Sequence, residues 1–311
     1  RAVAQAFGCR HHLLEAPAID AAAFARSIAA LDQPLADPAY VMTRALSELT
    51  RRHVTVGISG DGGDELFAGY ARLAQEAAQY PPRLGQASAR ALIDAGLLPG
   101  ALLRRTLHGR ELLFYRRVEL GPWSGGRKRL GRYLAPRALA ACRPEATLAL
   151  WRELAGTMDC ASLMRADLWT YLSENCLAKA DRASMGHGLE VRVPMLGNPV
   201  LDAVLDLPAE LHFDAAGGKA LLRAIAERSL PRTVWDRPKH GFSVPLRELF
   251  AGPWREVAEG ALAQCEARAP FLDAQAVREH WRSALAGRGS RRLAYTFVVL
   301  LVWLETHRIE A

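Results

Sequence analysis

The sequence predicts a helix-rich α/β fold that contains part of a parallel sheet. A run of β-branched residues over Val54–Ile58 is typical of a buried strand. A glycine-rich turn follows it, and Leu66–Tyr70 is typical of the opening turns of a helix. After Leu163 helical periodicity dominates to the end of the chain, so we expect few strands beyond the first part of the molecule.

The first thirty residues predict an alternation of helix and strand. Arg1–Phe7 resembles the end of a helix closed by Gly8, and Arg10–Glu15 resembles a short strand. Ile19–Leu31 has the pattern of an amphipathic helix, and the prolines of the segment 32–38 end it. The chain therefore enters partway through a βαβ arrangement.

A second helix is predicted over Tyr40–Leu49, directly before the strand. Its apolar side chains recur at helical spacing and share one face: Val41, Ala45, Leu46 and Leu49. The resulting unit of helix, strand, acidic loop and helix is of ordinary parallel α/β design.

Composition allows a large core and shows one uneven feature. The 311 residues are 50% hydrophobic and 23% charged, enough for one large domain or two small ones. The formal charge is +7, but residues 81–157 hold 14 Lys and Arg against 5 Asp and Glu. Such a segment can attract nucleic acid or phosphorylated ligands. Because aromatic residues are not interleaved as in a known binding module, we interpret it as a solvated helical face and expect no nucleic-acid partner. Its prolines and glycines also predict a lid-like segment.

Cysteine usage and hydropathy predict a cytoplasmic protein. The cysteines show no CxxC or other metal-ligand spacing, as expected of thiols in a reducing compartment: Cys9, Cys142, Cys160, Cys176 and Cys265. The most apolar stretch, Leu293–Leu304, is too short to cross a bilayer and fits a buried terminal helix, so we expect no membrane partner.

The candidate site is the acidic loop Ser59–Glu65, with the sequence SGDGGDE. It combines three glycines (Gly60, Gly62, Gly63) with three carboxylates (Asp61, Asp64, Glu65). Mg²⁺ typically takes one or two carboxylates together with substrate phosphates, and α/β folds bind ligands at the carboxyl ends of parallel strands. The alternative is a solvated turn that caps a helix. No Gly-Lys-Ser/Thr follows, so the loop is not a Walker loop.

Two further segments concentrate charge. Leu177–Leu196 reads LAKADRASMGHGLEVRVPML, and its charged side chains form either a structural ion-pair network or the wall of a binding site. Arg237–Phe242 reads RPKHGF, where Lys239 is either an exposed surface charge or a group that contacts a ligand.

These three segments, in this order, resemble the signatures of the synthetase domain of the asparagine synthetase family. The resemblance implies an adenine-nucleotide-alpha-hydrolase-like (ATP pyrophosphatase) fold over 1–311, with a nucleotide-site part at 1–80, a basic helical insertion at 81–157 and a helical substrate-site part at 158–311. The family's glutaminase domain, expected upstream in the full chain, and its SGGxDS pyrophosphate loop are absent. We therefore expect an N-terminally truncated domain that is inactive, or nearly so, by itself.

The resemblance also implies a reaction. ATP and Mg²⁺ would convert aspartate to asparagine through a β-aspartyl-adenylate, with AMP formed and ammonia supplied from glutamine. Relatives of the same fold amidate sugars of surface polysaccharides or close β-lactam and peptide rings, so the identity of the acceptor carboxylate stays open. The chain could also be a non-catalytic remnant of the domain. A homodimer is a further possibility.

Roles follow from the matched positions. Asp61 would act as a general base, Asp64 would bind Mg²⁺, and Lys239 would stabilise the charge that develops on the α-phosphate. The remaining candidates would bind ATP or substrate: Ser59, Gly60, Gly62, Gly63, Glu65, Asp181, Arg182 and Glu190. Glu65 would orient the substrate or simply cap the helix. One departure is Gly197, where the family has Asp; its loss removes a helix cap or an ion-pair partner and weakens local stability.

Overall fold

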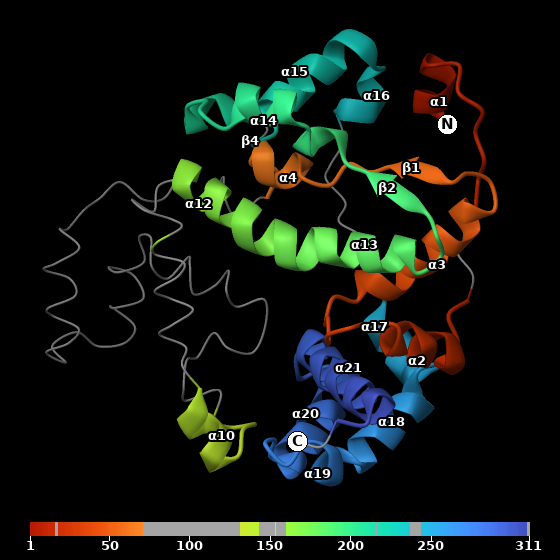
Figure 1. Cartoon of the computed structure of the whole chain (residues 1–311), viewed down its shortest axis with the longest axis vertical. Coiled ribbons are helices and arrows are strands. Elements are labelled where there is room, and N and C mark those ends of the chain that lie inside the picture. Colours follow the sequence, from red (N-terminus) through yellow and green to blue (C-terminus); the bar gives the residue numbers. More distant parts are fainter. Residues whose placement is uncertain are drawn as a thin grey trace, which may run out of the picture.

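The computed structural model describes residues 1–15, 18–70, 131–142, 153, 160–214, 217–236 and 244–309. In Figure 1 a long helical segment crosses the molecule, with the strands and α4 on one side and a helical bundle on the other. The predictions for residues 81–157 fall almost entirely outside the described residues, as does the whole of Arg237–Phe242. No helix in the described ranges is long and apolar enough to cross a membrane.

The predicted parallel pairing is present but short. Strand β1 (Val56–Ile58) pairs with β2 (Glu190–Arg192), and Val56 lies opposite Glu190. The expectation that this strand is buried is wrong, because the side chain of Ile58 is 79% exposed. Residues opposite each other in register share a face, so Ile58 lies beside the exposed Arg192, and no described element covers that face.

The N-terminal elements follow the predicted order with one exception. Helix α1 spans Ala2–Ala6, and Gly8 follows it with φ +61°, as expected of a helix end. Arg10–Glu15 forms no strand, so that prediction is wrong; the segment has no strand partner among the described residues. Helix α2 (Ala21–Ala29) begins at Asp20, whose carboxylate accepts a 2.7 Å hydrogen bond from the N–H of Ala23.

Helix α3 spans Ala39–Arg51 and confirms the predicted helix before the strand. Val41 is buried as expected, but Leu46 is half exposed, so the predicted apolar face is rotated. Tyr40 and Ser47 are buried in its place.

The crossing segment consists of three consecutive helical elements. Helix α12 (Cys160–Asp167) continues into a π-helical stretch η2 (Leu168–Leu177) and then into α13 (Ala178–Met185). Helix α12 packs on α4, whereas α13 packs on α3. The segment therefore connects the acidic loop to the bundle.

The bundle holds the larger core. It consists of α2 with five C-terminal helices: α17 (Leu246–Ala251), α18 (Arg255–Ala263), α19 (Cys265–Arg268), α20 (Ala274–Leu285) and α21 (Arg291–His307). Helix α21 confirms the predicted buried terminal helix. Trp254 stacks on Phe24 with ring centroids 4.3 Å apart and donates a 2.8 Å hydrogen bond to the carbonyl of Ile19. Helix α2, near the start of the chain, is therefore packed into the C-terminal bundle.

The other side of the molecule has a smaller core around Leu66, Phe67 and Val204. Its elements are α4 (Gly63–Leu66), η3 (Pro194–Leu196), α14 (Asn198–Val204), η4 (Ala209–His212), the hairpin of β3 (Phe213–Asp214) and β4 (Gly217–Gly218), α15 (Ala220–Ser229) and α16 (Arg232–Trp235). Helix α10 (Pro136–Ala141) lies apart, near the bundle (Figure 1). The prediction that Leu66–Tyr70 forms the opening turns of a helix is wrong. Helix α4 ends at Leu66, because Ala68 adopts φ +52° and turns the backbone out of the helix.

Candidate nucleotide site at the acidic loop

The acidic loop turns directly after β1. The N–H of Ser59 donates a 2.9 Å hydrogen bond to the carbonyl of Arg192, which extends the strand pairing by one residue. Gly62 has φ +83°, a conformation that favours glycine. A Cβ at Gly62 would lie 2.5 Å from Cδ2 of Leu196, so a larger residue there would strain the turn and displace the side chain of Leu196.

Asp61 is held inside the loop. The hydroxyl of Ser59 donates to Oδ2 of Asp61, and the N–H of Asp61 donates to Oγ of Ser59 over 3.2 Å. The side chain is half buried. A carboxylate fixed in this way keeps lone pairs available to accept a proton or a further hydrogen bond.

Asp64 forms an ion pair that the sequence analysis missed. Nζ of Lys219 lies 2.8 Å from Oδ1 of Asp64, and the side chains are 34% and 28% exposed, respectively. Lys219 precedes α15 in the left-handed region, with φ +65°. A signal existed in the sequence, where Gly217-Gly218-Lys219 directly precedes a helical pattern, but nothing local indicated its partner.

Glu65 is a buried carboxylate, 2% exposed. It accepts a hydrogen bond from the hydroxyl of Tyr70, and Sγ of Cys176 lies 3.7 Å from the same oxygen. Burial, reinforced by the negative charge of Glu65, raises the pKa of Cys176 to about 12 and raises the pKa of Tyr70 as well. Both groups therefore stay protonated and donate to Glu65, which makes Glu65 an internal anchor of α4.

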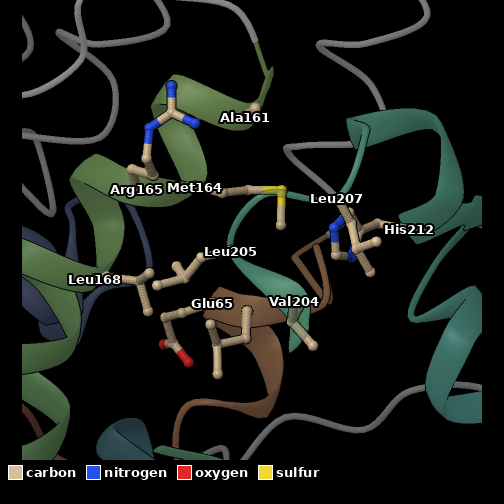
Figure 2. A pocket seen from close by; sticks show the side chains of 10 residues that line it. Glu65, Ala161, Met164, Arg165, Leu168, Val204, Leu205, Leu207 and His212 are labelled. Carbon is tan, nitrogen blue, oxygen red and sulfur yellow. The ribbon is translucent and has the colours of Figure 1, made fainter. Parts of the chain in front are cut away.

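A small pocket lies beside Glu65, between α4, α12 and α14 (Figure 2). Its walls are mainly apolar, and Arg165 and His212 lie at opposite sides of it. His212 is buried, its Nδ1 has no partner among the described residues, and burial lowers its pKa, so the imidazole is neutral.

The charged residues of α13 connect mainly to the segment 32–38. Nζ of Lys179 lies 2.8 Å from Oδ2 of Asp37, and the amide of Asn175 donates to the same oxygen over 3.1 Å. Burial would raise the pKa of Asp37, but the charge and hydrogen bond of Lys179 outweigh it and bring the pKa below its usual value. Arg182 contacts Asp32 through two nitrogens.

Other predicted residues lie apart from the loop or outside the described residues. Asp181 is exposed on α13, and Glu190 forms an exposed ion pair with Arg192 of its own strand at 2.8 Å. Glu190 begins β2, two residues before the carboxyl end that borders the loop. Lys239 falls in a segment that the structure does not describe, so its position relative to Asp64 stays a prediction.

Gly197 occupies the N-cap of α14, where no side chain caps the helix. The expectation that a carboxylate at this position would cap a helix therefore agrees with the structure.

The donor set fits a metal that arrives with a nucleotide. Within the described ranges, no group of three His, Cys, Asp or Glu side chains could hold a metal by itself. Asp64, however, already accommodates a positive charge, the ammonium of Lys219. One carboxylate together with phosphate oxygens is a common way to hold Mg²⁺, and Asp64 is a carboxylate of that kind.

Comparison with known proteins agrees with this geometry. Residues 1–305 match the asparagine synthase family. Relatives from Mycobacterium bovis and from two strains of Mycobacterium tuberculosis, each named "Putative asparagine synthetase (glutamine-hydrolyzing)", are 32% identical over 97% of this chain and 47% of their own length. "Asparagine synthetase (glutamine-hydrolyzing) 1" of Bacillus subtilis is 27% identical over 88% of this chain and 44% of its own length.

The chain thus spans about half the length of the curated relatives it matches. The family has an adenine-nucleotide-alpha-hydrolase-like fold, and the helix-rich structure with its small parallel sheet agrees with it. The chain belongs to the asparagine synthase family.

Proposed function

We propose that this chain is the synthetase part of an ATP-dependent, AMP-forming amide synthetase that converts aspartate to asparagine with glutamine-derived ammonia. Membership of the asparagine synthase family supports the proposal. The observation that carries it is the loop after β1, in which a left-handed Gly62 presents Asp61 and Asp64 beyond the end of a parallel strand.

Asp64 is the proposed metal ligand. The Mg²⁺ bound there would neutralise charge on the phosphates of ATP as pyrophosphate leaves. Lys219 already pairs with this carboxylate, which supports a role for Asp64 in holding a cation. The backbone of Gly60, Gly62 and Gly63 would allow a ligand to approach the loop closely.

Two groups are proposed for the chemical steps. A side-chain oxygen of aspartate attacks the α-phosphorus, pyrophosphate departs, and Lys239 would stabilise the negative charge on the α-phosphate oxygens. Ammonia then attacks the acyl carbon, AMP departs, and Asp61 would take the proton that the nitrogen loses. The hydrogen bonds between Ser59 and Asp61 favour this role because they hold the carboxylate in one orientation.

The remaining candidates are proposed to act through the scaffold. Arg182 would position α13 through Asp32, and Glu65 would anchor α4 beside the site. Asp181 and Glu190 would border the substrate cleft at its rim. We further propose a cytoplasmic location and a glutaminase domain on the same polypeptide as the source of ammonia.

The test uses the full-length protein with aspartate, α-labelled ATP and ammonium chloride. We expect AMP and pyrophosphate to form only when aspartate is present. Lys239→Ala should abolish the aspartate-dependent release of pyrophosphate, and Asp64→Asn should mainly raise the Mg²⁺ concentration that half-maximal rate requires.

Glu259→Gln is the matched control, because it neutralises an exposed carboxylate of the bundle that pairs with Arg255 of its own helix. Its rate should equal that of the unchanged protein. Normal pyrophosphate release by Lys239→Ala would remove Lys239 from the mechanism, and release that depends on another carboxylate would replace aspartate as the acceptor.

A further inference from the structure

The ion pair between Asp64 and Lys219 joins two parts of the chain that are distant in sequence. Oδ1 of Asp64, a side chain proposed to hold the metal, lies 2.8 Å from an ammonium group. A metal ion binds a carboxylate oxygen at about 2.0–2.1 Å when the ion is Mg²⁺. The same oxygen cannot hold both cations closely without strong repulsion between them.

The backbone places Lys219 against the loop with little freedom. Its N–H donates a 2.8 Å hydrogen bond to the carbonyl of Phe67, directly after α4. A Cβ at Gly218 would lie 1.7 Å from the carbonyl oxygen of Ala68, so the hairpin and the end of α4 are in contact.

The ion pair of Asp64 and Lys219 also lies close to the backbone of Gly69. A Cβ there would lie 2.0 Å from Oδ1 of Asp64 and 2.3 Å from Cε of Lys219. The ion pair therefore lies directly over the backbone of Gly69, where a larger residue would displace it.

Arg223 braces the hairpin independently of the loop. Its guanidinium donates to the carbonyls of Gly217 and Gly218, over 3.1 and 2.6 Å, and pairs with Asp214. Lys219 has a left-handed φ, which strains any residue other than glycine. Such a conformation persists only when contacts with the surrounding structure hold it in place. These contacts supply that support.

We propose that Lys219 is a positioning residue that occupies Asp64 until a metal bound to the nucleotide replaces its ammonium. The inference rests on the proposed function, since it assumes a nucleotide at the loop. Before the nucleotide arrives, the ammonium neutralises Asp64 and keeps the acidic loop ordered. Free Mg²⁺ must compete with the ammonium of Lys219 for Asp64. A metal bound to a nucleotide arrives with phosphate oxygens, which the ammonium can contact after it leaves Asp64.

The test measures nucleotide binding and needs no turnover. The full-length protein is titrated with Mg²⁺ in the presence of a fluorescent ATP analogue and without amino acid, and the Mg²⁺ midpoint of binding is recorded. Lys219→Met, which keeps the length of the side chain and removes its charge, should lower the midpoint about two- to five-fold, the range expected for a partly exposed ion pair. Asp64→Asn should raise it.

Two further variants exclude structural explanations. Lys219→Asn tolerates the left-handed conformation and cannot span the distance to Asp64, so it should lower the midpoint as well, even where Lys219→Met folds poorly. Arg223→Met loosens the same hairpin but keeps the charges of both Asp64 and Lys219, so its midpoint should shift less than that of either Lys219 variant.

An unchanged or raised midpoint in both Lys219 variants overturns the inference, as does an equal shift in Arg223→Met. If the full-length protein binds no nucleotide at any Mg²⁺ concentration, the proposed function fails and the inference fails with it. Nucleotide binding with unaltered midpoints overturns the inference alone.

Discussion

The helical bundle and the half that carries the acidic loop are stabilised in different ways. The bundle surrounds fully buried aromatic side chains, with Trp254 between Phe24 and Phe250. The loop half has a small apolar core and relies on single contacts, such as the pair of Asp64 with Lys219 and the packing of Gly62 on Leu196. The first half stabilises the fold, and the second holds the polar groups of the proposed site.

The crossing helix connects these halves through charge. Lys179 pairs with Asp37 and Arg182 with Asp32, so α13 is fixed to the segment that leaves α2. A loop of low intrinsic stability can then keep a defined position, because its supporting helix is tied to a rigid bundle.

The largest effect should come from the bundle. Trp254→Ala removes a fully buried ring and a hydrogen bond to Ile19, and we expect the free energy of unfolding to fall by about 3–5 kcal/mol in urea denaturation. The control is Trp169→Ala, because Trp169 is 72% exposed and its loss should change stability by less than about 0.5 kcal/mol. Equal losses would contradict the assignment of stability to the bundle.

The second-largest loss of stability should come from breaking the connection between the halves. Lys179→Met leaves the mostly buried Asp37 without its charge partner, and we expect a loss of about 2–3 kcal/mol, below the 3–5 kcal/mol of fully buried pairs. Arg52→Met breaks an exposed pair with Glu48 and should cost less than about 1 kcal/mol. A similar cost for both would show that the buried pair does not connect the halves.

The same pair predicts a dependence of stability on pH. Because the pKa of Asp37 is lower in the folded state than its ordinary value of 3.8, its contribution is complete above that value. The contribution is lost as the pH falls through the lower, folded-state pKa. Urea denaturation between pH 6 and pH 2.5 should therefore show an acid loss that is smaller in Lys179→Met; an identical acid loss in both proteins would exclude Asp37 as its source.

Within the loop the expected effect is smaller. Gly62→Ala forces a side chain into the left-handed region against Leu196 and should lower the free energy of unfolding by about 1–2 kcal/mol. Gly60→Ala is the matched change, because a Cβ at Gly60 would meet no atom of the described residues within 4 Å. Equal stability of the two variants would show that the turn at Gly62 is not strained.

The smallest effect should be a gain. Gly197→Asp adds a carboxylate at the N-cap of α14, and we expect a rise of a few tenths of a kcal/mol. Gly197→Ala supplies the Cβ without the cap, so its free energy of unfolding should not rise. A decrease in Gly197→Asp would mean that the contact of its Cβ with the carbonyl of Pro194, 3.3 Å away, outweighs the cap.

Local pattern sufficed for some elements and failed for others. Helix α21 and the turn after β1 were predicted because apolar runs and clustered glycines act over a few residues. The burial of β1 was predicted wrongly because it depends on neighbouring elements, which a strand's own residues do not specify. Lys219 was missed for the same reason, since its partner lies far away in the sequence.

The π-helical stretch η2 makes the crossing segment sensitive to its length. A π turn contains more residues than an α turn, and α12 and α13 face different neighbours on either side of the stretch. Removal of one residue within Leu168–Leu177 would turn all of α13 by about 100° relative to α12. A single lost codon there would pull Lys179 and Arg182 away from their partners together, although no charged residue had been altered.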